Sequence, residues 1–213
     1  MVLEQERRLI VDYGKKLITH GLTRGTGGNL SAFNRESGLA AISPSGIDYF
    51  ETAPEDVPVV DLEGRVVAGS HKPSSEMPFH VIFYKNRPEI SAVVHTHSVH
   101  ATALACLGLE LPALHYLIGF AGKNVRCANY ATFGTDGLAK NALAAMADRK
   151  AVLLANHGMI AGGADIREAF MIAETVEYCA EIYCRCRAIG QPLILPDSEM
   201  DLVMEKFKQY GKQ

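Results

Sequence analysis

The sequence predicts a single α/β domain with a mixed or mostly antiparallel sheet and flanking helices. Three observations lead to this fold class. Segments with helical periodicity alternate with short apolar segments, the early short segments come in pairs joined by tight turns, and no repeat or linker divides residues 1–213. A length of 213 residues, with 48% hydrophobic and 21% charged residues, is ordinary for one globular domain with a sizeable core.

The first part of the chain predicts a helix followed by paired strands. Residues 3–20 place Ile10, Tyr13 and Leu17 on one helical face, and Gly21 then ends the helix. Four short ranges bounded by turn residues predict strands: 30–34, 39–43, 57–62 and 65–68. Because the turns between the members of each pair are short, this part of the sheet is expected to be antiparallel.

The rest of the chain predicts helices around two buried strands. A helix is expected to begin near Ser74 or Ser75, either of whose hydroxyls could cap it, and to run through Tyr84. Apolar runs predict buried strands at 91–95 and 151–155, the second with a further short strand after it. The remaining helices are expected at 99–107, 136–147, 165–189 and 199–210.

The charge balance excludes a generic anionic partner. The 21 Lys and Arg residues against 24 Asp and Glu residues give a net charge of -3, which is not the basic excess that binds nucleic acids or membranes. The amino terminus is charged at once, without the apolar run of a signal peptide, and nowhere do 18 apolar residues follow one another. The 5 Cys residues, an odd number, favour reduced thiols. We therefore expect a cytoplasmic protein that binds neither nucleic acid nor a membrane.

Three histidines at the ends of the two apolar runs predict a metal site. His95 and His97 end the first run, where residues two apart share a face of a strand, and His157 follows the second run. Neutral imidazole suits Zn²⁺, and a catalytic zinc site takes three protein ligands and leaves one position open. The first two histidines alone are more typical of polar residues leaving a strand, and His157 shifts the balance to a metal. We expect ordinary roles for His20, His71, His80 and His115, and either a supporting or an ordinary helical role for His100.

Segments rich in glycine and serine predict an anion site. The loop at 25–29 lets backbone N–H groups approach an anion, although alone it is as typical of a plain turn. It lacks the Lys-Ser/Thr pair of a P-loop and follows a helix, so the nucleotide and dinucleotide motifs do not fit. Hydroxyls at 43–46 and at 72–76 strengthen the prediction, because the second segment opens a helix whose dipole favours an anion.

Glu76 is the candidate for proton transfer. In the first turn of a helix a carboxylate also serves as a capping partner, but Glu76 is the only carboxylate placed within one of these motifs. Lys72 offers a metal-free alternative, in which a lysine forms a Schiff base with the substrate. That alternative leaves the three histidines without a purpose.

Seven motifs in a fixed order resemble the class II aldolase/adducin family. They are GTGGN, SPSG, KPSSE, HTHSVH, ALHY, YATFGT and ANHG, spread over residues 25–158. The resemblance extends over nearly the whole chain and implies one domain, 1–213, with a largely antiparallel sheet of nine strands and helices on both sides. It also implies a homotetramer whose active sites lie between subunits.

The resemblance implies roles for individual residues. His95, His97 and His157 would hold one zinc ion per subunit, with Glu76 as a further ligand in the empty site and as the acid/base group. Tyr116 would come from the adjacent subunit and move the proton on the aldehyde-side oxygen. The substrate phosphate would lie against Gly28, Asn29, Ser45, Gly46, Ser74 and Ser75, and the aldehyde pocket would include Phe133 and Tyr210.

The implied activity is the reversible, zinc-dependent cleavage of a ketose 1-phosphate to dihydroxyacetone phosphate and a short aldehyde. The motifs are most similar to those of members that act on L-fuculose 1-phosphate and release L-lactaldehyde, which implies fucose metabolism. Members that act on 5-deoxyribulose or methylthioribulose 1-phosphate are alternatives. L-Ribulose-5-phosphate 4-epimerase shares the chemistry, but the segment after Leu114 resembles the aldolases. A noncatalytic scaffold like the adducin head is the non-enzymatic alternative, which the complete ligand set disfavours.

Overall fold

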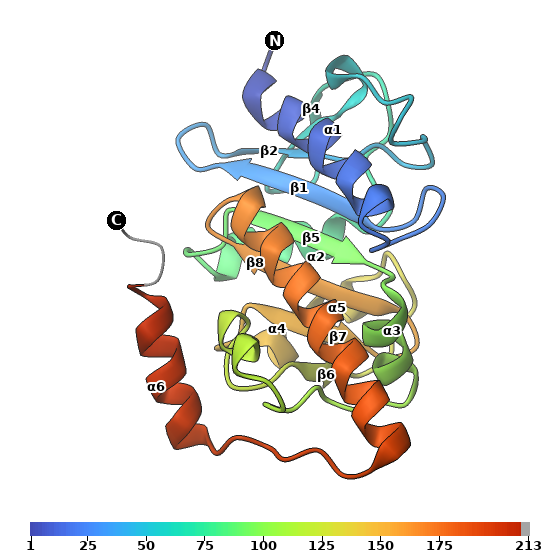
Figure 1. Cartoon of the computed structure of the whole chain (residues 1–213). Helices are drawn as coiled ribbons and strands as arrows, with labels where there is room; N and C mark the ends of the chain where they lie inside the picture. Colours follow the sequence, from blue (N-terminus) through green and yellow to red (C-terminus); the bar gives the residue numbers. More distant parts are fainter. Residues whose placement is uncertain (210–213) are drawn as a thin grey trace.

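The computed structural model describes residues 1–209 of the chain, and one sheet runs through the middle of this part. Figure 1 shows the sheet with helices on both sides. Its strands are β1 Asn29–Asn34, β2 Leu39–Ile42, β3 Val59–Asp61, β4 Val66–Ala68, β5 Ala92–Thr96, β6 Arg126–Ala128, β7 Ala151–Leu154 and β8 Gly158–Gly163. The helices are α1 Glu4–Thr19, α2 Met77–Asn86, α3 Val99–Cys106, α4 Asp136–Met146, α5 Ile166–Ile189 and α6 Asp197–Phe207, with short 3₁₀ helices η1 Pro54–Asp56 and η2 Tyr116–Phe120. None of these helices is long and apolar enough to cross a membrane.

The strand order is β4-β3-β2-β1-β5-β8-β7-β6, and the predicted fold class is confirmed. Every neighbouring pair is antiparallel except β6 and β7, which are parallel. The expectation of nine strands is corrected, because the described residues contribute 8 strands to the sheet. Two further contacts, between Pro44 and Pro73 and between Leu111 and Val125, remain isolated bridges.

Alternate residues of the central strands pack into two separate cores. Val94 and Leu153 face the core that is covered by α1, α3 and α5, whereas Val93 and Val152 face the core that is covered by α2 and α4. Figure 1 shows these two groups of helices on opposite sides of the sheet. Burial on both faces explains why β5 and β7 are apolar without alternation, which made them recognisable as buried strands.

Helix α2 begins later than the sequence analysis predicts. Its first residue is Met77, and Glu76 occupies the N-cap position without a capping hydrogen bond from its side chain. The backbone N–H of Ser74 donates to the carbonyl of Ser43 (3.0 Å), and that of Ser45 donates to the carbonyl of Lys72 (2.9 Å). These bonds hold 72–74 extended beside 43–45, so the helix cannot start at Ser74.

Candidate active site

Three separate parts of the fold bring together four side chains that could hold a metal ion. His95 lies in β5 and His97 follows it, His157 lies in the turn between β7 and β8, and Glu76 precedes α2. Each of the four offers one ligand atom, and these atoms all lie within 4.8 Å of one another. The structure therefore assembles the cluster that the spacing of the histidines predicts.

Two glycines allow the neighbouring segments to approach β5 closely. A Cβ atom on Gly158 would lie 2.3 Å from the carbonyl oxygen of Thr96, and a Cβ on Gly28 would lie 2.7 Å from that of His95. Gly28 also has a φ of +67°, a backbone conformation that favours glycine. Side chains at these two positions would push the loop at 25–29 and strand β8 away from the histidines.

The hydrogen bonds of His95 fix which of its nitrogens faces the cluster. The ring is fully buried, and its Nδ1 lies 2.9 Å from the carbonyl oxygen of Met159. Because a carbonyl only accepts, Nδ1 carries the hydrogen and Nε2 is the ligand atom. That Nε2 lies 2.9 Å from Nε2 of His97 and 3.2 Å from Oε2 of Glu76.

These contacts place several electron-pair donors around one point. Glu76 is 6% exposed, its Oε1 lies 3.2 Å from Nε2 of His157, and that oxygen accepts no hydrogen bond. A proton on Nε2 of His95 would be hydrogen bonded to Oε2 of Glu76, but Oε1 of Glu76 and the facing ring nitrogens of His97 and His157 would remain without a partner. A divalent cation satisfies all four, and a carboxylate with three imidazoles is a donor set that zinc accepts. The residues present thus fit a metal ion.

The acid–base properties of Glu76, His97 and His157 favour the form in which each can bind a metal. Burial alone raises the pKa of Glu76, but the hydrogen bond and the charge of His95 outweigh it and lower the pKa to about 2. Burial lowers the pKa of His97 and of His157 to about 4 in each case, and the charge of His95 adds to the effect. At neutral pH Glu76 is therefore ionised, and these two imidazoles are neutral.

A cavity of about 280 Å³ opens beside the cluster. Its wall contains Glu76, His97 and His157. Two further predicted residues, Ser75 and Phe133, line it as well. The other lining residues are Tyr130, Ala131 and Asn156, for which the sequence predicts no individual role.

The family of the chain follows from comparison with known proteins. The profile of the Class II Aldolase and Adducin N-terminal domain matches residues 8–184. The chain belongs to this family. It is 57% identical to a 5-deoxy-D-ribulose 1-phosphate aldolase of Bacillus thuringiensis serovar kurstaki over 100% of both chains. It is 41% identical to an L-fuculose phosphate aldolase of Escherichia coli K12, over 96% of this chain and 94% of that protein. A solved structure of an L-fuculose 1-phosphate aldolase matches with a TM-score of 0.94 and 54% identity over 96% of each chain.

In this class II aldolase the two serine-containing segments, 43–45 and 72–74, lie side by side, because backbone hydrogen bonds join them. Ser45 and Ser75 are exposed, and Gly46 has a φ of +72° in the same turn. Ser74 instead is buried, and its hydroxyl accepts from the N–H of Glu76 (3.2 Å). The side chain of Asn29 is buried too. The predicted phosphate-binding residues thus include exposed and inward-facing side chains.

Two other expectations concern described residues that do not line the cavity, Tyr116 and His100. Tyr116, at the start of η2, is 51% exposed and is not among the lining residues. Its ring neighbours are His115, at 4.9 Å between ring centroids, and Phe207, at 6.0 Å. Nδ1 of His100 lies 2.9 Å from Oε1 of Glu177, so its partner is helix α5 and not the metal cluster. Tyr210 lies outside the described residues.

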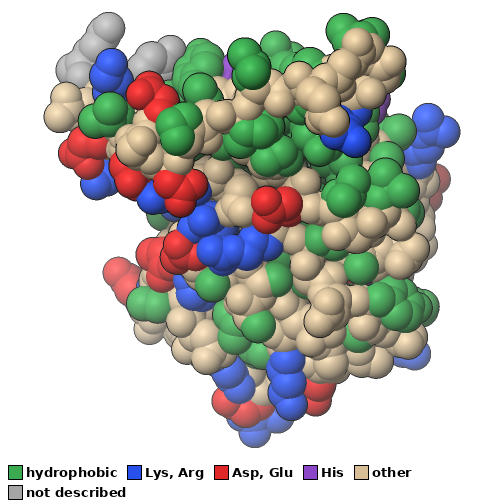
Figure 2. Space-filling view, turned by 90° about the horizontal axis from the view of Figure 1, so that it is seen from below, with side chains coloured by type: hydrophobic (Ala, Val, Ile, Leu, Met, Phe, Trp, Pro, Cys, Tyr) green, Lys and Arg blue, Asp and Glu red, His purple; other side chains and the backbone are tan. Residues whose placement is uncertain are grey.

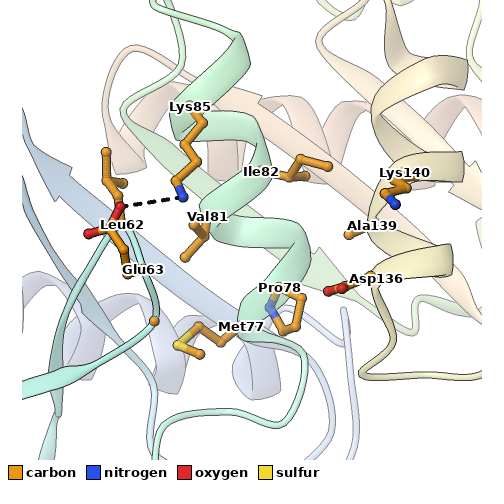
Figure 3. Close-up of a pocket in the computed structure, with 11 residues that line it drawn as sticks. Leu62, Glu63, Met77, Pro78, Val81, Ile82, Lys85, Asp136, Ala139 and Lys140 are labelled. Carbon is orange, nitrogen blue, oxygen red and sulfur yellow. Dashed lines mark ion pairs between the residues drawn. The ribbon is translucent and has the colours of Figure 1, made fainter.

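A second cavity in the aldolase lies away from this site. Figure 3 shows it between α2, α4 and the turn from β3 to β4, with Met77, Val81 and Ile82 among its apolar lining residues. At its edge, Nζ of Lys85 and Oε1 of Glu63 form an ion pair of 3.6 Å. None of the predicted site residues lines this cavity.

Proposed function

We propose that this class II aldolase is a zinc enzyme that reversibly cleaves a deoxyketose 1-phosphate to dihydroxyacetone phosphate and a short aldehyde. The convergence of one buried carboxylate and three imidazoles at the wall of a cavity carries the proposal. Neither a Schiff-base enzyme nor a noncatalytic scaffold requires such a group of residues.

The first candidate substrate is 5-deoxyribulose 1-phosphate. The support is the relative of that activity, which is 57% identical over the whole length. Cleavage between C3 and C4 of this sugar releases acetaldehyde. The second candidate is L-fuculose 1-phosphate, supported by the solved aldolase structure at 54% identity, and its cleavage releases lactaldehyde. The two aldehydes differ by a hydroxymethylene unit, which a pocket containing Phe133 and Tyr130 would discriminate by only about 1–3 kcal/mol.

His95, His97 and His157 would hold the zinc ion, with Glu76 as a fourth ligand in the free enzyme. When bound, the ion supplies a Lewis acid that stabilises negative charge on the substrate oxygens as the carbon–carbon bond breaks.

The other site residues orient the substrate and move its protons. Backbone N–H groups at Gly28 and Gly46 and the hydroxyls of Ser45 and Ser75 would bind the phosphate, which fixes the position of C3. In the synthesis direction, Glu76 as a carboxylate removes a proton from C3 of dihydroxyacetone phosphate, and C3 then attacks the aldehyde carbon. Tyr116 of an adjacent subunit would give its proton to the aldehyde oxygen, which becomes the C4 hydroxyl. Cleavage follows the same steps in reverse.

A homotetramer with one zinc ion per subunit is part of the proposal. Tyr116 does not line the cavity of its own subunit and is half exposed, so a neighbouring subunit is the place where it would act. Exposed apolar side chains support association: Ile189 is 90% exposed and Leu193 is 91% exposed. In Figure 1 the segment after α5 runs along the lower side of the molecule. Figure 2 shows this side from below, with hydrophobic side chains on its surface.

The test is a cleavage assay on a panel of sugar phosphates with the zinc-loaded protein. Dihydroxyacetone phosphate is measured by its enzymatic reduction and the aldehyde by mass spectrometry. We expect the highest kcat/KM for 5-deoxyribulose 1-phosphate and the next for L-fuculose 1-phosphate. If no ketose 1-phosphate yields dihydroxyacetone phosphate, the proposal is wrong. Epimerisation of L-ribulose 5-phosphate without free aldehyde would indicate the 4-epimerase, and absence of both turnover and bound zinc would indicate the scaffold.

A further inference from the structure

A buried row of polar side chains links Glu76 to the far end of helix α2. Glu76, His80 and Tyr84 are spaced by four residues and share one face of the helix. Asn29 and Ser31 are spaced by two residues and share one face of β1. The two sets interdigitate between helix and strand.

Four consecutive contacts connect these five residues. Nδ2 of Asn29 lies 2.9 Å from Oε2 of Glu76, and Oδ1 of Asn29 lies 2.6 Å from Nε2 of His80. Nδ1 of His80 lies 2.6 Å from Oγ of Ser31, which is also hydrogen bonded to the hydroxyl of Tyr84. All five residues are buried, and His80 is only 1% exposed.

The chemistry of the groups sets the direction of every hydrogen bond in this row. The carboxylate of Glu76 only accepts, so Asn29 must present its NH₂ group there and its oxygen to His80. His80 then donates through Nε2 and accepts at Nδ1 from the hydroxyl of Ser31. That hydroxyl in turn accepts from Tyr84. Burial lowers the pKa of His80 to about 3, which agrees with a neutral ring of one tautomer.

His80 fixes the oxygen end of the Asn29 amide, whose NH₂ end faces Glu76. An amide has similar shape in its two orientations, and only its partners distinguish them. If His80 donated no hydrogen, the amide could turn its oxygen toward Glu76, where two acceptors would repel each other. A buried row of polar groups is also costly unless every member is paired, so packing alone does not account for it.

We propose that His80 is a positioning residue, which holds the amide of Asn29 so that Nδ2 donates to Glu76 and keeps this carboxylate oriented toward the three histidines. The inference rests on the proposed role of Glu76 as a metal ligand and acid/base group. His80 touches neither the substrate nor the metal in this arrangement. It acts only through Asn29.

The experiment compares His80→Leu, which removes the donor, with His80→Gln, whose amide can still donate to Asn29. For the full-length oligomer of each variant, zinc affinity is measured by competition with a chelating dye, and proton exchange at C3 of dihydroxyacetone phosphate by NMR in D₂O. We expect His80→Leu to weaken zinc binding and to slow the exchange by about 10-fold or more, as for residues that orient metal ligands. His80→Gln should restore most of both, and the KM for the ketose phosphate should change little in either variant.

Ser31→Ala is the second variant, in case His80→Leu does not fold. It removes the group that fixes the tautomer of His80, and it should produce the same changes to a smaller extent. Unchanged zinc affinity in His80→Leu, or in Ser31→Ala where His80→Leu does not fold, would overturn the inference, as would equal loss in His80→Leu and His80→Gln. The zinc measurement decides this even if the wild-type protein cleaves no ketose phosphate, an outcome that would refute only the proposed function.

Discussion

In the proposed mechanism Glu76 meets two requirements, because it is ionised in a buried position and would also reach the carbon that exchanges a proton. Burial raises its pKa, whereas the contact with His95 and the hydrogen bond from Asn29 lower it to about 2. The carboxylate is therefore the form present at neutral pH, as a general base requires. The contacts that position Glu76 thus also determine its protonation state.

Replacement of this carboxylate tests its role in proton transfer. Glu76→Gln keeps the shape of the side chain and an oxygen that can accept from Asn29, and the three histidines remain. We expect proton exchange at C3 of dihydroxyacetone phosphate to fall by about 10²- to 10⁴-fold. Binding of the ketose phosphate should persist, as measured by calorimetry. Exchange at the wild-type rate would exclude Glu76 as the base.

Gly28 offers a matched comparison at the scale of one residue. Gly28→Ala introduces a Cβ at 2.7 Å from the carbonyl of His95 at a φ of +67°, whereas Gly38→Ala has a φ of +69° and nothing within 4 Å. We expect Gly38→Ala to cost about 1–2 kcal/mol of unfolding free energy for the left-handed backbone. Gly28→Ala should cost about 1–3 kcal/mol more for the overlap, and should also lower the zinc content. Both quantities are measured by urea unfolding and metal analysis, and equal effects of the two variants would contradict the close approach.

At the scale of elements, burial determines which strands can be predicted from the sequence. Strand β7 and the first three residues of β5 are apolar without alternation because both faces are covered, and the sequence predicts both strands at nearly their observed bounds. Strand β6 was not predicted, because it contains only Arg126, Cys127 and Ala128 and its partner is a parallel strand distant in sequence. The start of α2 was predicted too early, because the pairing of 72–74 with 43–45 is a tertiary contact that no local pattern reveals.

The same distinction holds for the candidate site. The three histidines were predictable because each follows a recognisable strand, and the structure brings them together with Glu76. His80 was assigned an ordinary role in its helix, although its spacing of four from Glu76 and Tyr84 was visible in the sequence. That spacing acquires a meaning only when α2 lies against Asn29 and Ser31 of β1, which local sequence cannot show.

The packing of helix α5 leads to a prediction about thiol reactivity. Cys179 faces the core of the molecule, and burial raises its pKa to about 12, whereas Cys106 at the end of α3 is exposed. Because the thiolate is the reactive form, Cys179 should resist alkylation by iodoacetamide at pH 8 in the native protein and react only after unfolding. Peptide mass mapping with Cys106→Ala as the reference measures this directly. Rapid modification of Cys179 in the native protein would contradict the packing of α5.

At the scale of the whole molecule, the proposed site requires two subunits, and hybrid oligomers test this. Tyr116→Phe and Glu76→Gln should each be nearly inactive as pure oligomers. When the two variants are co-expressed or refolded together, random association leaves about one quarter of the sites with both native residues, so about one quarter of the activity should return. Activity that never exceeds the sum of the separate variants would place Tyr116 and Glu76 in the same subunit's site, or remove Tyr116 from the mechanism.

The central claim is that Glu76, His95, His97 and His157 hold a metal ion on which cleavage depends. The most direct measurement is the release of dihydroxyacetone phosphate from 5-deoxyribulose 1-phosphate before and after a chelator removes the metal, with zinc content determined in parallel. We predict that activity falls in proportion to the zinc removed and returns when zinc is added back. Full activity in the metal-free protein, or trapping of the substrate on a lysine such as Lys72 by borohydride, would contradict the account.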